Sequence, residues 1–304
     1  MNSTVTMGSI LGVECDPSYR IVGLSLSKSQ VPRRRPFASL PTSHWLLGPL
    51  FCSFCLCFLL GGNNLRGTIP QELYAMKDLN KLSLQSNELF GSIPSLIFQL
   101  SKLTSIDFSE NALSSTIPND IFHLNQLSSL NLGYNHFTGL LPPILSKLQH
   151  LNISQNGFHG PIISSPRTQF RYPDDIDVID ISFNSFSGLD IFSGDGIQAF
   201  SNLRQLHFDG NNLNTDLPSS LDSLSSLSVL SGSRCRLTGR IPQEAIGRLS
   251  NLKVLSLSEN ELTGNIPSTI GNLQKLQVLE LYDNNLDGRI PDSVLQLPSL
   301  SKYI

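Results

Sequence analysis

A motif of the form L-x-x-L-x-L-x-x-N-x-L-x-G-x-I-P recurs about every 24 residues through most of the 304-residue chain. One copy begins at Leu252, has its Asn at Asn260 and ends at Pro267. A fixed period of this length is typical of a solenoid, a coil in which each repeat forms one turn. A solenoid offers a long surface in place of the enclosed pocket of most enzymes, so the repeat favours binding over catalysis.

The Asn of the motif, which we call the anchor, can be followed through ten repeats. The anchors are Asn63, Asn87, Asn111, Asn135, Asn156, Asn184, Asn211, Cys235, Asn260 and Asn284. Gly follows the anchor by four residues in eight repeats, and Pro follows it by seven residues in eight. A buried anchor amide can bond backbone groups that the turn leaves unpaired, so we expect the stacked anchors to form a ladder.

Other positions of the motif predict local structure. The apolar residues before each anchor alternate with polar ones, as in the Leu-Ser-Leu of residues 82–84, which predicts a short strand with Leu inward. Strands of successive turns are expected to run parallel, because each turn ends where the next begins. The Ile-Pro pair supplies one more core residue and a fixed φ that can open a short helical turn. We expect Leu-rich stretches such as residues 97–100 on the convex side.

This pattern resembles the plant-type leucine-rich repeat family over about residues 55–304. The family includes extracellular domains of plant receptor-like kinases and receptor-like proteins, and polygalacturonase-inhibiting proteins. The resemblance implies an α/β fold: a right-handed leucine-rich repeat solenoid with a parallel concave sheet and short 3-10 or α segments on the convex side. Cys235 at an anchor position fits the family, which alternates Asn and Cys there, and we interpret it as a small buried thiol.

The first part of the chain departs from the repeat. We interpret residues 1–29 as a partial N-terminal cap and first strand, residues 30–54 as an irregular basic and apolar insertion, and residues 55–304 as about ten repeats with the last incomplete. Leu24 and Leu26 precede Ser29, which occupies an anchor position. Family caps usually pair two Cys, whereas Cys15 has no evident partner here.

Three interpretations stay open for the extra stretch before Asn63. It is a distorted repeat with a surface loop, an internal membrane anchor with residues 33–35 (Arg-Arg-Arg) on the cytoplasmic side, or an irregular gene product. The apolar run from Trp45 to Leu60 is shorter than the roughly 20 residues of a spanning helix. No clear signal peptide stands at residue 1, and the last turn stops at Ile304 before an anchor, so we interpret the chain as a fragment.

Composition and motifs argue against catalysis, cofactors and nucleic acid. The net charge is −3 with 15% charged residues, and no basic stripe crosses the repeats. Cys52, Cys55 and Cys57 lie in an apolar run without nearby acidic ligands, so we expect no metal site there. The acidic residues of the segment 174–180 do not match an EF-hand loop, and residues 194–199 match a dinucleotide fingerprint only superficially. We therefore expect a non-enzymatic protein without a cofactor.

A ligand would contact the solvent-facing strand positions near each anchor. The residue four before the anchor and the two residues just before it give polar, slightly acidic columns with a few aromatics, which carry disproportionate binding energy. We predict ligand contacts on the concave face by Asp107, Tyr134, Asp180, Phe183, His207, Asp209, Arg234, Glu280 and Tyr282. Asn2 and Asn152 lie in sequons for N-glycosylation, although a glycan on Asn152 would obstruct the strand surface.

Two long intervals of 28 and 27 residues bracket Asn184. The first inserts residues 164–175, and the family often interrupts the array near ligand sites, so this segment resembles a small binding island. A solvated loop is the alternative interpretation.

The resemblance implies a recognition module, like the extracellular sensing domain of a plant receptor-like kinase or receptor-like protein. Its partners would be a peptide, glycan or protein ligand and a co-receptor. It would lie on the extracellular face of the plasma membrane or be secreted, with membrane association through missing or N-terminal apolar segments. The alternative is a secreted enzyme inhibitor of the polygalacturonase-inhibiting type. A third possibility, an ice-binding array, would favour a flat face rich in Thr or Asn, and the columns here are too varied.

Overall fold

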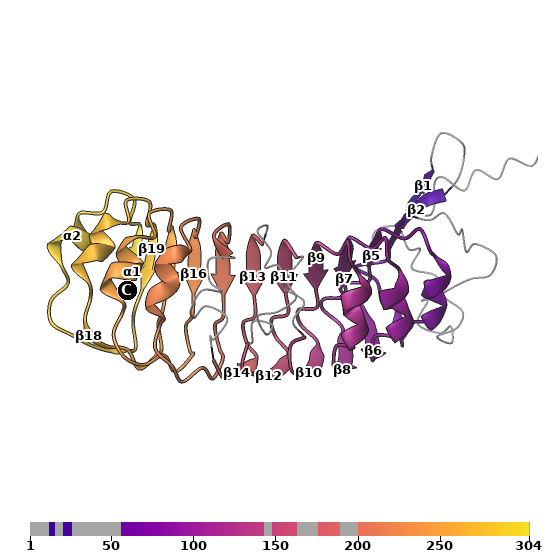
Figure 1. Cartoon of the computed structure of the whole chain (residues 1–304), viewed down its shortest axis with the longest axis horizontal. Helices are drawn as coiled ribbons and strands as arrows, with labels where there is room; N and C mark the ends of the chain where they lie inside the picture. The colour runs from indigo at the N-terminus through magenta and orange to yellow at the C-terminus, as the bar shows by residue number, and fades with distance from the viewer. Residues whose placement is uncertain are drawn as a thin grey trace, which may run out of the picture. The chain divides into compact units, whose positions relative to one another are not determined.

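The computed structural model describes residues 56–142, 148–162, 176–188 and 200–301, and the backbone of residues 12–15, 21–25 and 302–303. The chain divides into two compact units, Met1–Thr138 and Gly139–Ile304. Each unit stacks successive turns of a coil, and each turn contributes one strand to a parallel sheet (Figure 1). The basic run 33–35, Cys52, Cys55 and the inserted segment 164–175 lie outside the described residues.

In the first unit the strands pair in parallel, each with the strand of the next turn. They are β2 (Ile21–Ser25), β3 (Cys57–Leu59), β5 (Lys81–Ser83), β7 (Ser105–Asp107) and β9 (Ser129–Asn131). The register aligns Leu24 with Phe58, and Phe58 with Leu82, and the buried side chains of Phe58 and Leu82 lie in neighbouring turns. A further strand, β1 (Gly12–Cys15), pairs antiparallel with β2.

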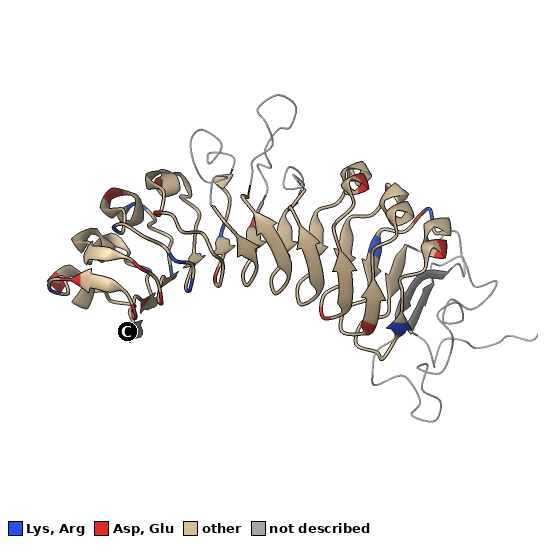
Figure 2. Ribbon diagram, turned by 90° about the horizontal axis from the view of Figure 1, so that it is seen from below, with Lys and Arg blue, Asp and Glu red and all other residues tan. Residues whose placement is uncertain are grey.

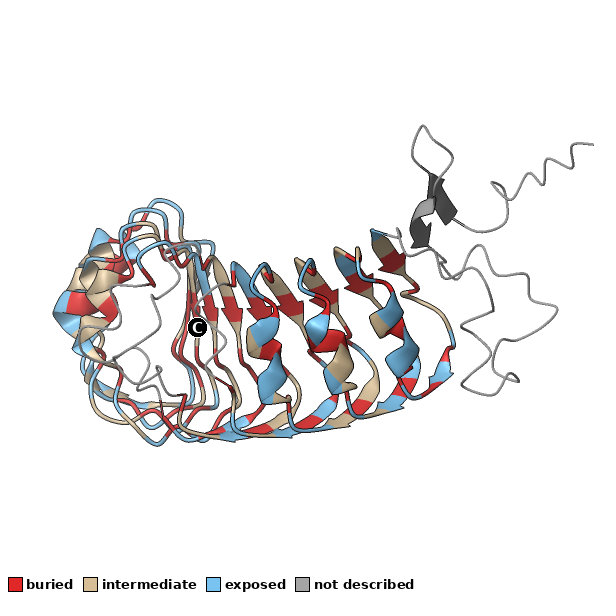
Figure 3. Cartoon of the chain, turned by 45° about the vertical axis from the view of Figure 1, so that its right-hand side comes forward, coloured by how far each residue is buried: buried red, intermediate tan, exposed pale blue. Residues whose placement is uncertain are grey.

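The second unit repeats this arrangement. Its parallel strands are β11 (His150–Asn152), β13 (Val178–Asp180), β15 (Gln205–His207), β16 (Val229–Ser231), β17 (Val254–Ser256), β19 (Val278–Glu280) and β21 (Lys302–Tyr303). The middle residue of each strand from β11 to β19 is buried, and the residues on either side of it are more exposed (Figure 3). The predicted α/β solenoid of parallel strands is confirmed.

Short helical segments follow the prolines, as predicted. They are η4 (Gln71–Ala75), η5 (Ser95–Gln99), η6 (Asn119–His123), η10 (Ser219–Ser223), α1 (Gln243–Gly247), η11 (Ser268–Asn272) and α2 (Asp292–Leu295). In each case Pro is the residue directly before the segment, with φ between −61° and −72°. The fixed φ of proline suits the entry to a helical turn.

A second set of short strands follows the anchors, and the motif did not predict it. In the first unit these strands are β4 (Arg66–Gly67), β6 (Glu88–Gly91), β8 (Ala112–Ser115) and β10 (His136–Gly139). In the second unit β12 (Gly157–Gly160) pairs with β14 (Ser185–Phe186), and β18 (Thr263–Asn265) pairs with β20 (Asn285–Asp287). These segments look like turns in the sequence, because they are short and most of them contain or adjoin the Gly that follows the anchor.

The anchor ladder is present, and Asn260 shows its geometry. Its Nδ2 donates to the carbonyl oxygens of Gly232, Leu257 and Ser258 at 2.8, 2.9 and 3.1 Å. Its Oδ1 accepts from the backbone N–H groups of Cys235 and Leu237 at 2.9 and 3.0 Å. One side chain therefore satisfies backbone groups of two successive turns that would otherwise be buried without partners.

Cys235 replaces the amide in one turn and changes the local bonding. Its thiol is buried and lies 3.0 Å from the carbonyl oxygen of Phe208, and burial raises the pKa of the thiol to about 12. The thiol has no amide oxygen to offer the preceding turn, and Leu213 N–H instead donates to the Cys235 carbonyl oxygen at 3.0 Å. Arg236 adopts a positive φ of 54° beside it. The structure therefore shows the buried thiol that the sequence suggested.

The residue before each anchor adopts a left-handed backbone conformation in every repeat. These residues are Gly62, Ser86, Glu110, Tyr134, Gln155, Phe183, Gly210, Arg234, Glu259 and Asp283, with φ between 52° and 68°. The conformation costs roughly 1–2 kcal/mol for a residue with a Cβ. It is retained because it turns the chain so that the anchor side chain points into the core.

The ladder makes Asn260 a sensitive position. We expect Asn260→Ala to lower the free energy of unfolding by roughly 3 kcal/mol, because two buried N–H groups and the carbonyl groups lose their partner. Urea denaturation followed by circular dichroism measures the change. Asn251→Ala, at a residue whose Nδ2 makes an exposed bond to Ser225, should change it by less than about 0.5 kcal/mol. Equal effects of the two substitutions would contradict the ladder's role.

Ser115 stands where most repeats have Gly, and its φ is 80°. We expect Ser115→Gly to raise the free energy of unfolding by about 1 kcal/mol, because Gly adopts positive φ without steric cost. The neighbouring Ser114→Gly should lower it by about 0.5–1 kcal/mol, since Gly weakens a strand that needs no positive φ. Thermal or urea unfolding of both variants measures the contrast, and a loss of stability in both would refute it.

Candidate functional site

The candidate site is the strand face, which we define as the outward side chains of β13 to β19 in the second unit. Two rows run along it, one on each side of the buried middle residue of the strands. The central row consists of Asp180, His207, Ser231, Ser256 and Glu280. The valine row consists of Val178, Gln205, Val229, Val254 and Val278, which the parallel pairing aligns.

A hydrogen-bond network of hydroxyl, carboxylate and backbone N–H groups joins the strand face to the turns that follow it, across four successive turns. Asp209 Oδ1 accepts from Ser231 Oγ and from Ser233 N–H, both at 2.8 Å. Ser233 Oγ lies 3.0 Å from Ser256 Oγ, which donates to Glu280 Oε2 at 2.8 Å. These bonds hold the carboxylates in fixed orientations, so their remaining lone pairs point in defined directions before any ligand arrives.

Three of the residues four before an anchor accept a hydrogen bond from the backbone two residues later. Asp180 Oδ1 accepts from Ser182 N–H at 3.0 Å, and in the first unit Asp107 Oδ1 accepts from Ser109 N–H at 3.1 Å. Asn152 Oδ1 likewise accepts from Ser154 N–H at 2.9 Å, so the sequon asparagine is tied to its own strand. Each of these groups therefore caps the backbone two residues later while keeping one edge toward solvent. The other sequon, at Asn2, lies outside the described residues.

Exposed aromatic side chains lie where the sequence placed them. Phe183 and Tyr282 of the second unit are 43% and 39% exposed, and Tyr134 of the first unit is 57% exposed. Phe183 lies against Gly210, because a Cβ added to Gly210 would approach Phe183 Cδ1 to 2.5 Å. The absence of a side chain at Gly210 therefore leaves room for the Phe183 ring to pack against the backbone. Contact of these residues with a ligand stays a prediction.

Further charged residues lie in the turns that directly follow the strands (Figure 2). Arg234 Nε donates to Glu259 Oε2 at 2.7 Å, and this bond lowers the pKa of Glu259 and raises that of Arg234. Both side chains come from the left-handed position before an anchor. Asp283 occupies the same position one turn later, so this end of the face carries more acid than base.

The valine row was not predicted. The sequence analysis considered only positions close to the anchor, whereas strand alternation also turns outward the residue six before it. The sequence did contain this pattern, because in four turns a Val lies two residues before the central-row residue of the same strand. These valines are half-buried and provide apolar surface beside the polar central row.

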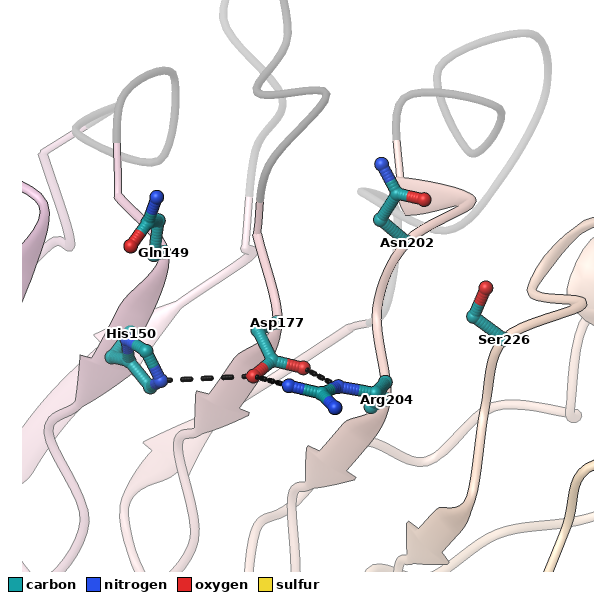
Figure 4. Close-up of a pocket in the computed structure, with 6 residues that line it drawn as sticks. All are labelled: Gln149, His150, Asp177, Asn202, Arg204 and Ser226. Atoms are coloured by element: carbon teal, nitrogen blue, oxygen red, sulfur yellow. Dashed lines mark hydrogen bonds and ion pairs between the residues drawn. The ribbon is translucent and has the colours of Figure 1, made fainter.

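A polar depression of about 490 Å³ adjoins the starting ends of the strands. Its lining residues are Gln149, His150, Asp177, Asn202, Arg204 and Ser226 (Figure 4). Arg204 makes a two-pronged ion pair with Asp177, in which Nη2 lies 2.6 Å from Oδ2 and Nε contacts Oδ1. His150 Nε2 lies 3.7 Å from Asp177 Oδ2 on the other side. The sequence analysis considered Asp177 only as part of a calcium motif.

Among the described residues, no group of His, Cys, Asp and Glu is placed to hold a metal ion. Within the same part of the chain, no helix is long and apolar enough to cross a membrane. The residues that resemble a dinucleotide fingerprint, 194–199, lie outside this part.

Three family profiles match the chain, and all describe leucine-rich repeats. The profile described as a leucine-rich repeat region matches residues 202–302, and two leucine-rich repeat profiles match residues 77–137 and 147–168. The matched segments together make up more than half of the chain. The chain therefore belongs to the leucine-rich repeat proteins, as the motif and the stacked strands indicated. A comparison with curated proteins gives no significant match.

Solved structures narrow the family to its plant type. A TDR receptor is 27% identical with a TM-score of 0.75, and the match covers 92% of this chain and 50% of that one. The leucine-rich repeat ectodomain of the plant membrane receptor kinase GASSHO1/SCHENGEN3 from Arabidopsis thaliana, in complex with CASPARIAN STRIP INTEGRITY FACTOR 2, is 25% identical with a TM-score of 0.71. That match covers 95% of this chain and 39% of the other. The chain thus spans half or less of these two receptor chains.

A plant ice-binding protein is also similar, with 27% identity and a TM-score of 0.72. This match covers 92% of this chain and 86% of that one. The fold alone therefore does not separate sensing from other uses of the same coil.

The ion pair in the depression predicts a pH dependence. The hydrogen bond from Arg204 lowers the pKa of Asp177 below its ordinary value, so the stabilising contribution of the pair is present at neutral pH. It is lost as the pH falls through the lowered pKa. We expect Asp177→Asn to be less stable than the unsubstituted chain above about pH 5, and the difference to shrink below about pH 4. Urea midpoints across this range measure it.

The control for this prediction removes the partner. In an Arg204→Gln background, Asp177→Asn should have a smaller effect on stability and a weaker dependence on pH, because Arg204 is the largest cause of the lowered pKa. An unchanged pH dependence in that background would contradict the assignment.

Proposed function

We propose that the chain is the ligand-recognition part of an extracellular plant receptor-like kinase or receptor-like protein, and that it binds an extended peptide or protein segment across the strand face. The observation that carries this proposal is the strand face, on which the outward side chains of successive turns line up in rows. Similarity to the TDR receptor and to a plant membrane receptor kinase ectodomain supports it.

The geometry suits an extended segment. Neighbouring parallel strands lie about 4.8 Å apart, so successive turns present contacts at a regular spacing along a line across the strands. Apolar contacts from the valine row lie beside hydrogen-bonding groups of the central row. The valine row can therefore select ligand side chains by their apolar shape, and the central row can select them by their hydrogen-bonding groups.

Rigidity contributes to recognition at this face. The network from Asp209 to Glu280 fixes polar groups before binding, which reduces the entropy lost when a ligand orders them. Phe183 packs against Gly210, and Tyr282 is partly exposed near the end of the described array. Each therefore presents an aromatic surface to a ligand at low conformational cost. Such groups are the expected centres of binding energy.

The proposed partners follow from the same comparison. The receptor kinase ectodomain that this chain resembles was solved in complex with CASPARIAN STRIP INTEGRITY FACTOR 2, and we infer a peptide or protein ligand here, with a co-receptor docking beside it. The proposed location is the extracellular face of the plasma membrane or the cell wall.

Ice binding is the second candidate, because the similar ice-binding protein is matched over most of its length. The central row argues against it, since Asp180, His207 and Glu280 interrupt any regular array of small hydroxyl groups. Measurement of thermal hysteresis separates this candidate from ligand recognition. Inhibition of a fungal polygalacturonase would instead support the secreted-inhibitor alternative.

The test of the proposed function uses a displayed library of linear peptides selected against the chain. We expect enriched peptides whose affinity falls about tenfold with Phe183→Ala, because a central aromatic contact contributes more than about 1 kcal/mol. Phe90→Ala is the matched control, since Phe90 is 46% exposed on β6, which belongs to the second set of strands in the first unit and not to the strand face. Fluorescence anisotropy measures both affinities. Failure to enrich any peptide, or equal losses with both variants, would overturn the proposal.

A further inference from the structure

The depression beside the strand face has the chemistry of a second binding site. All six lining side chains are polar, and they come from four successive turns of the second unit. Its volume of about 490 Å³ lies within the range of small-molecule sites, which is about 300–1,000 Å³. His150, Asp177 and Arg204 point toward one another, and Gln149, Asn202 and Ser226 lie around them (Figure 4).

The charges of the depression neutralise each other. The Asp177 carboxylate uses both oxygens on Arg204, so the one anion and the one guanidinium cancel. An anionic ligand would have to compete with Asp177 for Arg204, and a cationic ligand would have to compete with Arg204 for Asp177. A neutral ligand meets neither competition.

Hydrogen-bonding capacity nevertheless remains. A guanidinium has five N–H donors, and the ion pair occupies two of them. Each carboxylate oxygen keeps a lone pair, and the side chains of Gln149 and Ser226 make no hydrogen bond to any described residue. Both donors and acceptors therefore remain for a ligand beside the neutralised pair of Asp177 and Arg204.

We propose that this depression binds a neutral, hydroxyl-rich ligand, which chemically means a saccharide. A sugar hydroxyl both donates and accepts, so it can bond Arg204 and Asp177 together without separating them. Adjacent hydroxyls on a pyranose ring match the paired atoms of a carboxylate, guanidinium or amide group. This site is distinct from the proposed peptide contacts on the strand face and does not depend on them.

The depression lies at the starting ends of the strands, next to the strand face. His150 is the first residue of β11, and Asp177 and Arg204 directly precede β13 and β15. A saccharide held here would lie at the margin of the strand face. A free oligosaccharide and a sugar attached to a protein ligand share this chemistry, and the experiment below separates them.

The experiment titrates the whole chain with neutral oligosaccharides of glucose, xylose, arabinose and galactose, with trigalacturonate, and with inorganic phosphate. Saturation-transfer NMR and calorimetry report binding. We expect at least one neutral oligosaccharide to bind and to compete with none of the peptides selected on the strand face. Competition with those peptides would place the sugar on the strand face and overturn the assignment. A glycosylated peptide that binds more tightly than its bare form would identify the attached source.

The decisive variant is one that should shift the preference of the depression from neutral to anionic sugars. Asp177→Asn leaves Arg204 without its carboxylate, so affinity for the neutral sugar should fall roughly tenfold while trigalacturonate should gain affinity. Asp222→Asn is the matched control, because Asp222 pairs with Arg248 at 2.8 Å outside the depression, and it should change neither affinity. Gln149→Ala, at an exposed side chain that leaves the ion pair intact, should weaken the neutral sugar about threefold.

Three further results, none of which needs the selected peptides, would overturn the proposal. One is the absence of binding by every neutral oligosaccharide of the panel. Another is tighter binding of trigalacturonate or phosphate than of neutral sugars by the unsubstituted chain. The third is a neutral-sugar affinity that neither Asp177→Asn nor Gln149→Ala alters. Failure of the peptide selection would leave all three readouts unaffected, so this inference and the proposed function are tested separately.

Discussion

The buried amide of the anchor residue is the interaction on which the rest of each turn depends. Asn260 shows why, because its single side chain bonds three carbonyl oxygens and two N–H groups of neighbouring turns. A chain that bends this sharply leaves those groups without a strand or helix partner, and burial would then cost about 1–3 kcal/mol for each. The left-handed residue before the anchor and the short strand before that follow from placing the amide inward.

The same constraint organises the outward surface. Since every turn is held in the same register, outward side chains form rows, and rows of unlike chemistry lie side by side. Seryl hydroxyls and carboxylates then bond one another across turns, as from Asp209 to Ser231 and from Ser256 to Glu280. The result is a rigid, mixed surface with fixed polar groups, which suits recognition. A side chain at one turn is therefore positioned by its neighbours in the adjacent turns.

Much of the fold followed from local patterns. Alternation before the anchor predicted the strands, Pro predicted the helical segments, and the buried Asn predicted the ladder, because each depends on residues within one turn. The second set of strands was missed, since β8 and β10 are recognisable only when Ser115 and Phe137 pair between turns. The valine row was missed although alternation contained it. The exposed aromatics Phe183 and Tyr282 were placed on the surface correctly, and their role with a ligand stays a prediction.

By itself the sequence determined the repeat, the inward and outward positions and the membership of the leucine-rich repeat proteins, because these depend on periodicity that one turn already contains. Only the tertiary structure decided which side chains from different turns meet. Asp177 and Arg204, which are 27 residues apart, both lie seven residues before their anchors, so the repeat places them in adjacent turns. Only the stacking of β13 on β15 shows that their side chains meet in an ion pair, because that contact depends on how the two turns pack and not on the period alone.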